Sequence, residues 1–268
     1  MPETATSDRI ASAFAAAREQ GRAALMPYMM GGFPDHAASL SVAEAYVDAG
    51  ADLIELGVPF SDPLADGPVI HAADTAALNA GATLESVLEI CGAVADRVPV
   101  ALMCYANMVL AKELDEFSAL VAEAGAAAVI IPDLPLEEQD AIGKALSAKG
   151  LAVVPMVAPT TPPERRAAIC RTARGFVYVV STTGVTGERD ELPTELTELV
   201  SSVKAEAGVP VAVGFGISTS EQAAKVGEVA DGVIIGTRLV REVAENDVDA
   251  AVGAVGEFLR ETRAALER

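Results

Sequence analysis

Residues 55–68, ELGVPFSDPLADGP, hold three carboxylates, three prolines and no cation. Glu55 ends an apolar run that is typical of a buried strand, and Asp66 follows eleven residues later. Burial raises the pKa of a carboxyl group, so that it can give and take protons near neutral pH. Two carboxylates in different surroundings can divide the roles of acid and base. The residue types and their spacing therefore predict a proton-transfer site at Glu55 and Asp66.

A structural interpretation of the same stretch stays open. In it, Glu55 forms an ion pair, while Asp62 and Asp66 only cap turns. The scarcity of Lys and Arg nearby favours the chemical interpretation. The two histidines, His36 and His71, have no acid placed for a catalytic triad. We expect His36 to cap a helix or face solvent, and His71 to hydrogen-bond within the loop.

Two glycine-containing segments follow the last two predicted strands. They are GFGIS, residues 214–218, and GTRL, which begins at Gly236. Glycine lets backbone N–H groups approach an anion, and the N-terminus of a following helix adds a favourable dipole. In (β/α)8 barrels, phosphate commonly binds at the loops after strands seven and eight. These segments therefore predict a phosphate site.

Two further segments border the predicted site. Residues 181–190, STTGVTGERD, are rich in hydroxyl groups. They form either an ordinary loop or a lid with hinges at Gly184 and Gly187, and both interpretations stay open. Asp133 follows the fourth predicted strand. We expect its carboxylate to support the loop after strand two, or the lid, by hydrogen bonding.

Short apolar runs that do not alternate with polar residues are typical of strands covered on both faces. We expect such strands at 24–29, 51–56, 98–103, 127–131, 151–157, 175–180, 209–213 and 232–235. We expect helices at 7–20, 38–49, 84–95, 112–124, 137–148, 163–172, 193–207, 219–227 and 247–265.

Eight strands, each followed by a helix, predict an α/β fold of the (β/α)8 TIM-barrel type, with 7–20 as an extra N-terminal helix. The alternative is a doubly wound open sheet. That fold usually has fewer strands per domain, and no change in composition marks a linker. We therefore expect residues 1–268 to form a single barrel domain. Function in such barrels lies at the C-terminal ends of the strands, where Glu55 falls.

The composition excludes several classes of partner. A net charge of −20 over 268 residues disfavours nucleic acid and anionic lipid. No apolar run reaches the ~20 residues of a membrane helix, and the N-terminus lacks the pattern of a secretory signal. Three cysteines without a close pair fit neither a disulfide framework nor a zinc motif. We expect a cytoplasmic protein.

Residues 55–68 closely resemble the signature of the tryptophan synthase alpha chain family. The segments PYMMGGFPD, MCYANMV, IPDLPLEE, YVVSTTGVTG, GFGIS and GVIIGTRLV resemble other segments of that family, in its order. The resemblance covers nearly the whole chain after residue 24. It implies a lyase of L-tryptophan biosynthesis that cleaves indole-3-glycerol phosphate to indole and glyceraldehyde 3-phosphate in a retro-aldol reaction. It implies no cofactor in this chain, because the protonated indole is itself the electron sink.

The resemblance also implies roles for individual residues. Glu55 would move protons to the indole ring and from the glycerol hydroxyl, and Asp66 would stabilise positive charge at the indole nitrogen. Thr237 stands where serine is more usual. The implied substrate-binding residues are Tyr105, Tyr178 and Phe215 around the indole, Gly187, Gly216, Gly236 and Thr237 at the phosphate, and Thr186, which would hydrogen-bond the catalytic-loop aspartate. The implied partner is a beta chain that uses pyridoxal phosphate, in an α2β2 heterotetramer.

Two alternatives compete with this function. One is an isomerase or aldolase that acts on another phosphorylated substrate. An isomerase of the triosephosphate type needs a histidine and a lysine at strand ends, a Schiff-base aldolase needs a lysine in the barrel, and the predicted strands contain no lysine. The other is a regulatory subunit that binds ligand without catalysis. Such a chain would be expected to lose Glu55 or Asp66, and this one has both.

Overall fold

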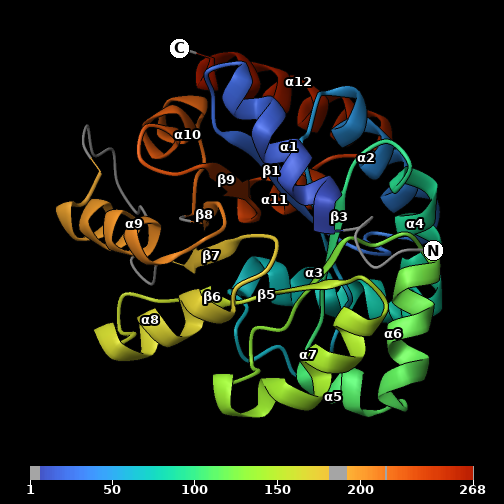
Figure 1. The fold of residues 1–268 in the computed structure, drawn as a ribbon. Coiled ribbons are helices and arrows are strands. Elements are labelled where there is room, and N and C mark those ends of the chain that lie inside the picture. Colours follow the sequence, from blue (N-terminus) through green and yellow to red (C-terminus); the bar gives the residue numbers. More distant parts are fainter. Residues whose placement is uncertain (1–6, 181–191, 215, 268) are drawn as a thin grey trace.

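The computed structural model describes residues 7–180, 192–214 and 216–267 (Figure 1). In these residues the strands form one sheet, in the order β5-β4-β3-β2-β1-β9-β8-β7-β6, and every pair is parallel. The strands are β1 (Ala24–Met30), β2 (Ile54–Gly57), β3 (Val100–Met103), β4 (Ala128–Ile130), β5 (Ala152–Val154), β6 (Met156–Val157), β7 (Val177–Val180), β8 (Val211–Gly214) and β9 (Gly232–Ile235).

The predicted strand 151–157 divides at Pro155 into β5 and β6. Proline has no backbone N–H, so it cannot donate to a sheet ladder. The Pro155 carbonyl still accepts a hydrogen bond from the Tyr178 N–H at 3.0 Å. Because β5 pairs with β4 and β6 pairs with β7, one chain segment joins both ends of the sheet. The sheet therefore closes, and the prediction of a (β/α)8 barrel is confirmed.

All nine expected helical segments are present, with ends shifted by a few residues. They are α1 (Ser7–Glu19), α2 (His36–Asp48), α4 (Leu84–Val94), α6 (Leu114–Glu123), α7 (Gln139–Ala148), α8 (Pro163–Thr172), α9 (Thr194–Glu206), α10 (Ser220–Gly227) and α12 (Val248–Leu266).

Three helices were not predicted. They are α3 (Pro68–Asn79), α5 (Ala106–Leu110) and α11 (Thr237–Glu245), whereas the start of the predicted helix 137–148 forms a separate 3-10 turn, η1 (Leu136–Glu138). The three helices directly follow the loops or ends of strands at the carboxyl end of the barrel. They therefore add structure at the end where the site was expected.

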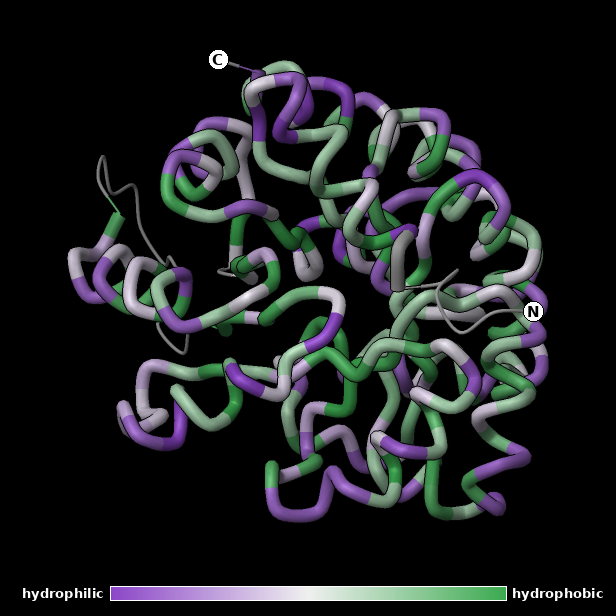
Figure 2. Tube along the Cα trace, in the orientation of Figure 1, coloured by the Kyte–Doolittle hydropathy of each residue, from purple (hydrophilic) through white to green (hydrophobic). Residues whose placement is uncertain are grey.

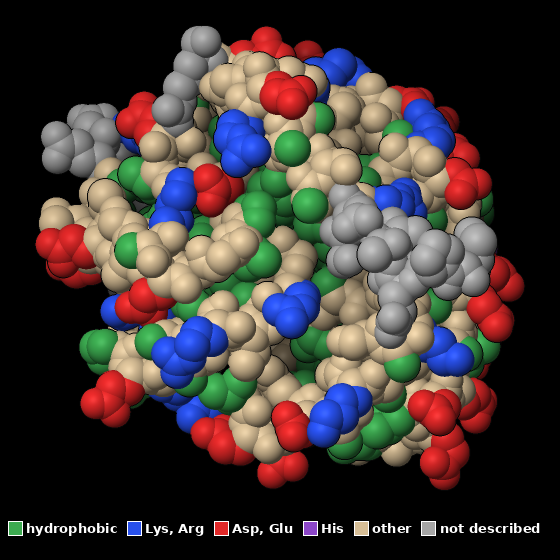
Figure 3. Space-filling view, in the orientation of Figure 1, with side chains coloured by type: hydrophobic (Ala, Val, Ile, Leu, Met, Phe, Trp, Pro, Cys, Tyr) green, Lys and Arg blue, Asp and Glu red, His purple; other side chains and the backbone are tan. Residues whose placement is uncertain are grey.

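Helix α1 covers the N-terminal end of the barrel (Figure 1). Ile10, Phe14 and Ala17 pack among inward-facing strand residues, and the ring centroids of Phe14 and Phe176 lie 5.9 Å apart. Figure 3 views this face of the molecule, where Lys and Arg are interspersed with acidic side chains that continue around the rim. The extra N-terminal helix thus closes one end of the barrel, and the other end remains for a ligand.

The remaining helices surround the barrel, and their apolar faces pack on the outward side chains of the strands. Figure 2 shows hydrophobic strands at the centre and hydrophilic stretches along the outer helices. At the N-terminal end an ion pair links separate segments. The Arg22 guanidinium donates to Asp52 Oδ2 at 2.5 Å and Oδ1 at 2.8 Å, and Arg263 of α12 lies 3.5 Å from Asp52 Oδ1.

Candidate active site

Glu55 points into the barrel from the carboxyl end of β2. In the sheet register it lies between Tyr28 of β1 and Ala101 of β3. The residue is 1% exposed, and its Oε2 has no hydrogen-bond partner in the described part of the chain. Burial, and secondly the charge of Asp66, raise the pKa of Glu55 from its ordinary 4.5 to about 8. The ion pair of the alternative, structural interpretation is therefore not found among the described residues.

The inward residues that follow Glu55 around the barrel are small. The row of inward residues that contains Glu55 continues through Ala101, Ala128 and Ala152 on the next three strands. Above it lies a cavity of about 270 Å³ at the carboxyl end of the barrel. The cavity walls include Tyr28, Glu55, Ala65, Asp66, Gly67, Ile70, Met103, Pro132, Met156, Tyr178, Val180, Gly214, Gly216, Ile234, Gly236 and Thr237.

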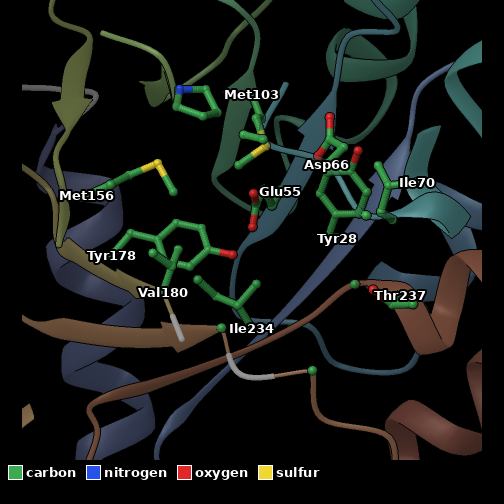
Figure 4. Close-up of a pocket in the computed structure, with 16 residues that line it drawn as sticks. Tyr28, Glu55, Asp66, Ile70, Met103, Met156, Tyr178, Val180, Ile234 and Thr237 are labelled. Carbon is green, nitrogen blue, oxygen red and sulfur yellow. The ribbon is translucent and has the colours of Figure 1, made fainter. Parts of the chain in front are cut away.

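Two tyrosines flank Glu55 on opposite walls of this cavity (Figure 4). A Cβ atom on Gly57 would lie 2.4 Å from the hydroxyl of Tyr28, and one on Gly214 would lie 2.5 Å from the hydroxyl of Tyr178. Each tyrosine therefore needs a glycine at the end of the next strand. A flat apolar ligand in the cavity would have one tyrosine ring on each side. It would contact the Glu55 carboxyl group, which lies between the two rings.

Asp66 lies half-buried at the rim of the cavity, on the loop between β2 and α3. Its Oδ2 accepts a hydrogen bond from the Tyr105 hydroxyl at 2.8 Å. The same hydroxyl accepts from the Ala65 N–H at 3.0 Å, so Tyr105 fixes both the loop backbone and the carboxylate. Burial raises the pKa of Asp66, while the Tyr105 hydrogen bond and the nearby His71 lower it. Asp66 and Glu55 thus have different surroundings, as the sequence predicts.

The start of α11, a helix that packs beside α3, forms another part of the cavity rim. Gly236 and Thr237 line the cavity there, together with Gly216 of the loop after β8. The N-cap residue of α11 is Gly236, which has no side chain to bond the N–H groups of the first turn. A helix N-terminus presents backbone N–H groups and partial positive charge to an anion. The glycine segments after the last two strands therefore meet at one place, as expected for a phosphate site.

Not every predicted site residue lies on the cavity wall. Tyr105 is buried behind Asp66 and is absent from the lining residues. Thr186, Gly187, Phe215 and the whole segment 181–190 lie outside the described residues. The cavity brings together the other predicted residues: Glu55, Asp66, Tyr178, Gly216, Gly236 and Thr237.

The structure gives Asp133 a different partner from the loop after strand two, and the alternative partner, the segment 181–190, lies outside the described residues. Asp133 Oδ1 accepts from the Ala106 N–H at 2.8 Å, so it holds the start of α5 and not the loop after strand two. Strands β3 and β4 are neighbours in the barrel, so the loop that carries Asp133 lies next to the start of α5. His36 is exposed at the start of α2, with Nε2 3.6 Å from Glu89 Oε2, and His71 is exposed on α3.

Sequence reasoning missed several residues of the cavity. Tyr28, Ile70, Met103, Met156 and Ile234 line it. Part of this could be predicted, because Tyr28 and Met103 lie in segments that the sequence identifies as strands. What was missing was the register between neighbouring strands. Without it, inward and outward positions of a fully apolar strand look alike.

The described residues contain no cluster of His, Cys, Asp or Glu that could hold a metal ion. Within the same part of the chain, no helix is both long and apolar enough to cross a membrane. The described cavity wall offers carboxyl, hydroxyl and backbone groups to a ligand.

The comparison with known proteins gives a consistent picture. The family model described as tryptophan synthase alpha chain matches residues 14–266. The tryptophan synthase alpha chain of Synechococcus sp. (strain CC9902) is 44% identical over 264 residues, which cover 97% of this chain and 98% of that protein. That of Carboxydothermus hydrogenoformans is 47% identical over 242 residues, or 90% of each chain.

A solved structure of tryptophan synthase from Mycobacterium tuberculosis superposes with a TM-score of 0.90 at 38% identity, and covers 97% of this chain and 98% of that chain. The family model and these relatives span almost the entire sequence, and the barrel is shared. The chain therefore belongs to the tryptophan synthase alpha chain family.

Proposed function

We propose that Glu55 and Asp66 carry out the cleavage of indole-3-glycerol phosphate in the cavity at the carboxyl end of the barrel. Membership of the family makes this chain a lyase of tryptophan biosynthesis, which releases indole and glyceraldehyde 3-phosphate. The observation that carries the proposal for the two acids is the buried carboxyl group of Glu55. Its Oε2 has no hydrogen-bond partner among the described residues, it lies on the cavity wall, and its pKa is raised to about 8.

Glu55 begins the reaction in its protonated form. It gives its proton to carbon 3 of the indole ring, and the ring nitrogen takes up the positive charge. The carboxylate then removes the proton of the glycerol hydroxyl on the carbon attached to the ring. As the O–H electrons form the aldehyde C=O, the C–C bond breaks and its electron pair restores the aromatic ring. Glu55 ends protonated, so one side chain completes the cycle.

Asp66 opposes the positive charge that forms on the indole nitrogen. An ionised carboxylate at the rim stabilises that charge in the transition state more than in the ground state, which is what lowers the barrier. The Tyr105 hydroxyl favours the ionised form of Asp66 and holds it in place. Tyr105 thus acts on the substrate through Asp66. Tyr178 borders the indole ring from the other side of Glu55.

The phosphate of the substrate binds where Gly216, Gly236 and Thr237 meet at the N-terminus of α11. Two features support this location: the cavity reaches these residues, and the N-cap residue of the helix, Gly236, has no side chain that could occupy the first N–H groups. A local array of N–H groups is needed because the net charge of −20 repels an anion. Gly187, Thr186 and Phe215 complete the substrate site in this proposal, on the motif positions they occupy.

The family implies a beta-chain partner. We place that partner at the mouth of the barrel, in an α2β2 assembly in which the beta chain holds pyridoxal phosphate. Leu64, on the loop after β2, is 81% exposed, and Leu110 of α5 is 60% exposed. Both lie at the carboxyl end of the barrel, so the partner would cover apolar surface next to the site. Asp62 is exposed there too, whereas Pro63 is buried. The assembly acts in the cytoplasm.

The test is release of indole from indole-3-glycerol phosphate by the purified chain, alone and with a beta chain. We expect Glu55→Gln and Asp66→Asn each to reduce kcat by ~10²-fold or more, the scale of general acid–base groups. Binding of glycerol phosphate should stay within twofold of wild type. If Glu55→Gln retains more than about a tenth of kcat, Glu55 does not move the proton. A non-catalytic ligand-binding subunit would release no indole at all.

A further inference from the structure

Asp74 is a buried acid that the proposed reaction does not use. It lies in the middle of α3 and is 1% exposed. Its neighbours on the buried face of α3 are Ile70, Ala73 and Ala77, which belong to an apolar cluster with Tyr28. An unpaired carboxylate is costly in such surroundings. Burial raises the pKa of Asp74 to about 7, an effect that the Phe60 hydrogen bond opposes and the charge of Asp66 reinforces.

The one hydrogen bond that Asp74 makes in the described structure goes to the catalytic loop. Oδ1 accepts from the Phe60 N–H at 3.0 Å, whereas Oδ2 is buried without a partner. Phe60 lies on the loop that joins Glu55 to Asp66. A buried backbone N–H needs a partner, and in this loop a side chain of α3 provides it. Asp74 therefore fixes the loop at the position of Phe60.

From Phe60, contacts lead directly to Asp66. The ring of Phe60 stacks on that of Tyr105, with centroids 5.1 Å apart and an interplanar angle of 23°. The Tyr105 hydroxyl then bonds both Asp66 Oδ2 and the Ala65 N–H. Loss of the bond to Asp74 would free the backbone of Phe60, and its ring would no longer be held against Tyr105.

The polar groups around Asp74 come from three other elements. Tyr28 of β1, Tyr105 after β3 and Asp66 of the loop all interact with the Asp74 charge. His71, one turn earlier on α3, is exposed and acts on Asp66. No Lys or Arg in the described residues pairs with Asp74. The charge of Asp74 is therefore balanced by hydrogen bonding to the loop and not by an ion pair.

We propose that Asp74 is a positioning residue for the lyase reaction: its buried carboxyl group fixes Phe60, and through Phe60 and Tyr105 it holds Asp66 at the cavity. A hydrogen bond to an ionised acceptor is roughly twice as strong as a neutral one. The hold on the loop therefore weakens as the pH falls through the region near 7, where Asp74 gains a proton. This proposal rests on the proposed role of Asp66.

The test compares two substitutions of Asp74. Asp74→Ala removes the acceptor, and we expect kcat for indole-3-glycerol phosphate at pH 8 to fall at least tenfold. Asp74→Asn keeps an acceptor oxygen, and kcat should recover to at least a third of wild type. The dissociation constant of glycerol phosphate should change less than twofold in both, because the Asp74 carboxyl group bonds the loop at Phe60 and makes no hydrogen bond to Gly236 or Thr237 in the described structure. Ala72→Gly, an exposed change on α3, controls for destabilisation of that helix by ~1 kcal/mol.

Amide hydrogen exchange gives a second readout that does not depend on activity. In the wild type, protection of the Phe60 amide should rise from pH 6 to pH 8, after correction for the intrinsic exchange rate. In Asp74→Asn it should show no such rise, because the amide does not ionise in this range. If Asp74→Ala does not fold, Phe60→Leu takes its place. That change should lower kcat by about tenfold while the amide at position 60 stays protected.

The outcomes separate this inference from the proposed function. If the wild type releases no indole, the proposed function fails, and exchange still reports whether Asp74 holds the loop. If the wild type is active but Asp74→Ala matches the kcat of Ala72→Gly, Asp74 is not a positioning residue. The same conclusion follows if Asp74→Asn is as impaired as Asp74→Ala, or if protection at Phe60 does not depend on the residue at position 74.

Discussion

Replacement of Glu55 by Gln should make the folded protein more stable at high pH. The folded state raises the pKa of Glu55 from 4.5 to about 8, mainly through burial. Between these two values the unfolded chain loses the proton while the folded chain keeps it. The free energy of unfolding therefore falls as the pH rises across this window. Gln does not titrate, so the free energy of unfolding of the variant does not fall for this reason.

The expected size follows from the two pKa values. One pKa unit corresponds to about 1.4 kcal/mol, which gives up to ~5 kcal/mol above pH 8. Between pH 5 and pH 9 the difference in unfolding free energy between variant and wild type should change by about 4 kcal/mol. The cost of burying the Gln amide does not vary with pH, because the amide does not ionise in this range. The other buried acid, Asp74, is present in both proteins, so its contribution to the pH dependence cancels in the difference between their unfolding free energies.

Urea unfolding at pH 5, 7 and 9 measures this difference without ligand. Glu198→Gln, an exposed position on α9, is the matched control and should show no comparable change with pH. If the Glu55→Gln difference changes by less than 1 kcal/mol between pH 5 and 9, Glu55 is not held protonated by the fold. The argument for its role as an acid would then lose its basis.

Three further changes test other parts of the structure. Gly216 has φ +64°, so Gly216→Val strains the backbone as well as blocking the anion; glycerol phosphate should bind at least tenfold more weakly in a calorimetric titration, and equal affinity would place the phosphate elsewhere. Gly214→Ala places a methyl group 2.5 Å from the Tyr178 hydroxyl and should lower kcat/KM for indole-3-glycerol phosphate about tenfold; an unchanged value would mean that Tyr178 does not border the substrate. Asp52→Asn leaves Arg22, whose side chain is 1% exposed, without its charged partner and should cost ~3 kcal/mol in urea unfolding; a loss under 1 kcal/mol would show that the pair contributes little.

The sequence was sufficient for the barrel because its strands are short, apolar and regularly spaced. It was also sufficient for the place of Glu55, since function in such barrels lies at the ends of strands. The division of strand 151–157 had a visible cause in Pro155, which cannot donate to a ladder. Helix α3 also had local signals that went unused: Pro68 in its first turn, and Ile70, Ala73 and Ala77 at helical spacing.

Other features depend on contacts between distant segments. That Tyr105 holds Asp66 requires the end of β3 to meet the loop after β2, and no local pattern indicates this. Asp74 is a mid-helix acid, a type that usually faces solvent. Its burial becomes evident only when α3 packs beside β1 and the loop. The register that turns Tyr28 inward is likewise a property of the assembled sheet.

The central claim is that Glu55 must be protonated to start the cleavage. The most direct measurement is kcat/KM of the purified chain for indole-3-glycerol phosphate from pH 5 to pH 10, which reports groups of the free enzyme. The account predicts a fall of about tenfold per unit above pH ~8, where Glu55 loses its proton. It also predicts a fall toward acid pH as Asp66 is protonated. A value of kcat/KM that stays constant from pH 7 to pH 10 would contradict the claim.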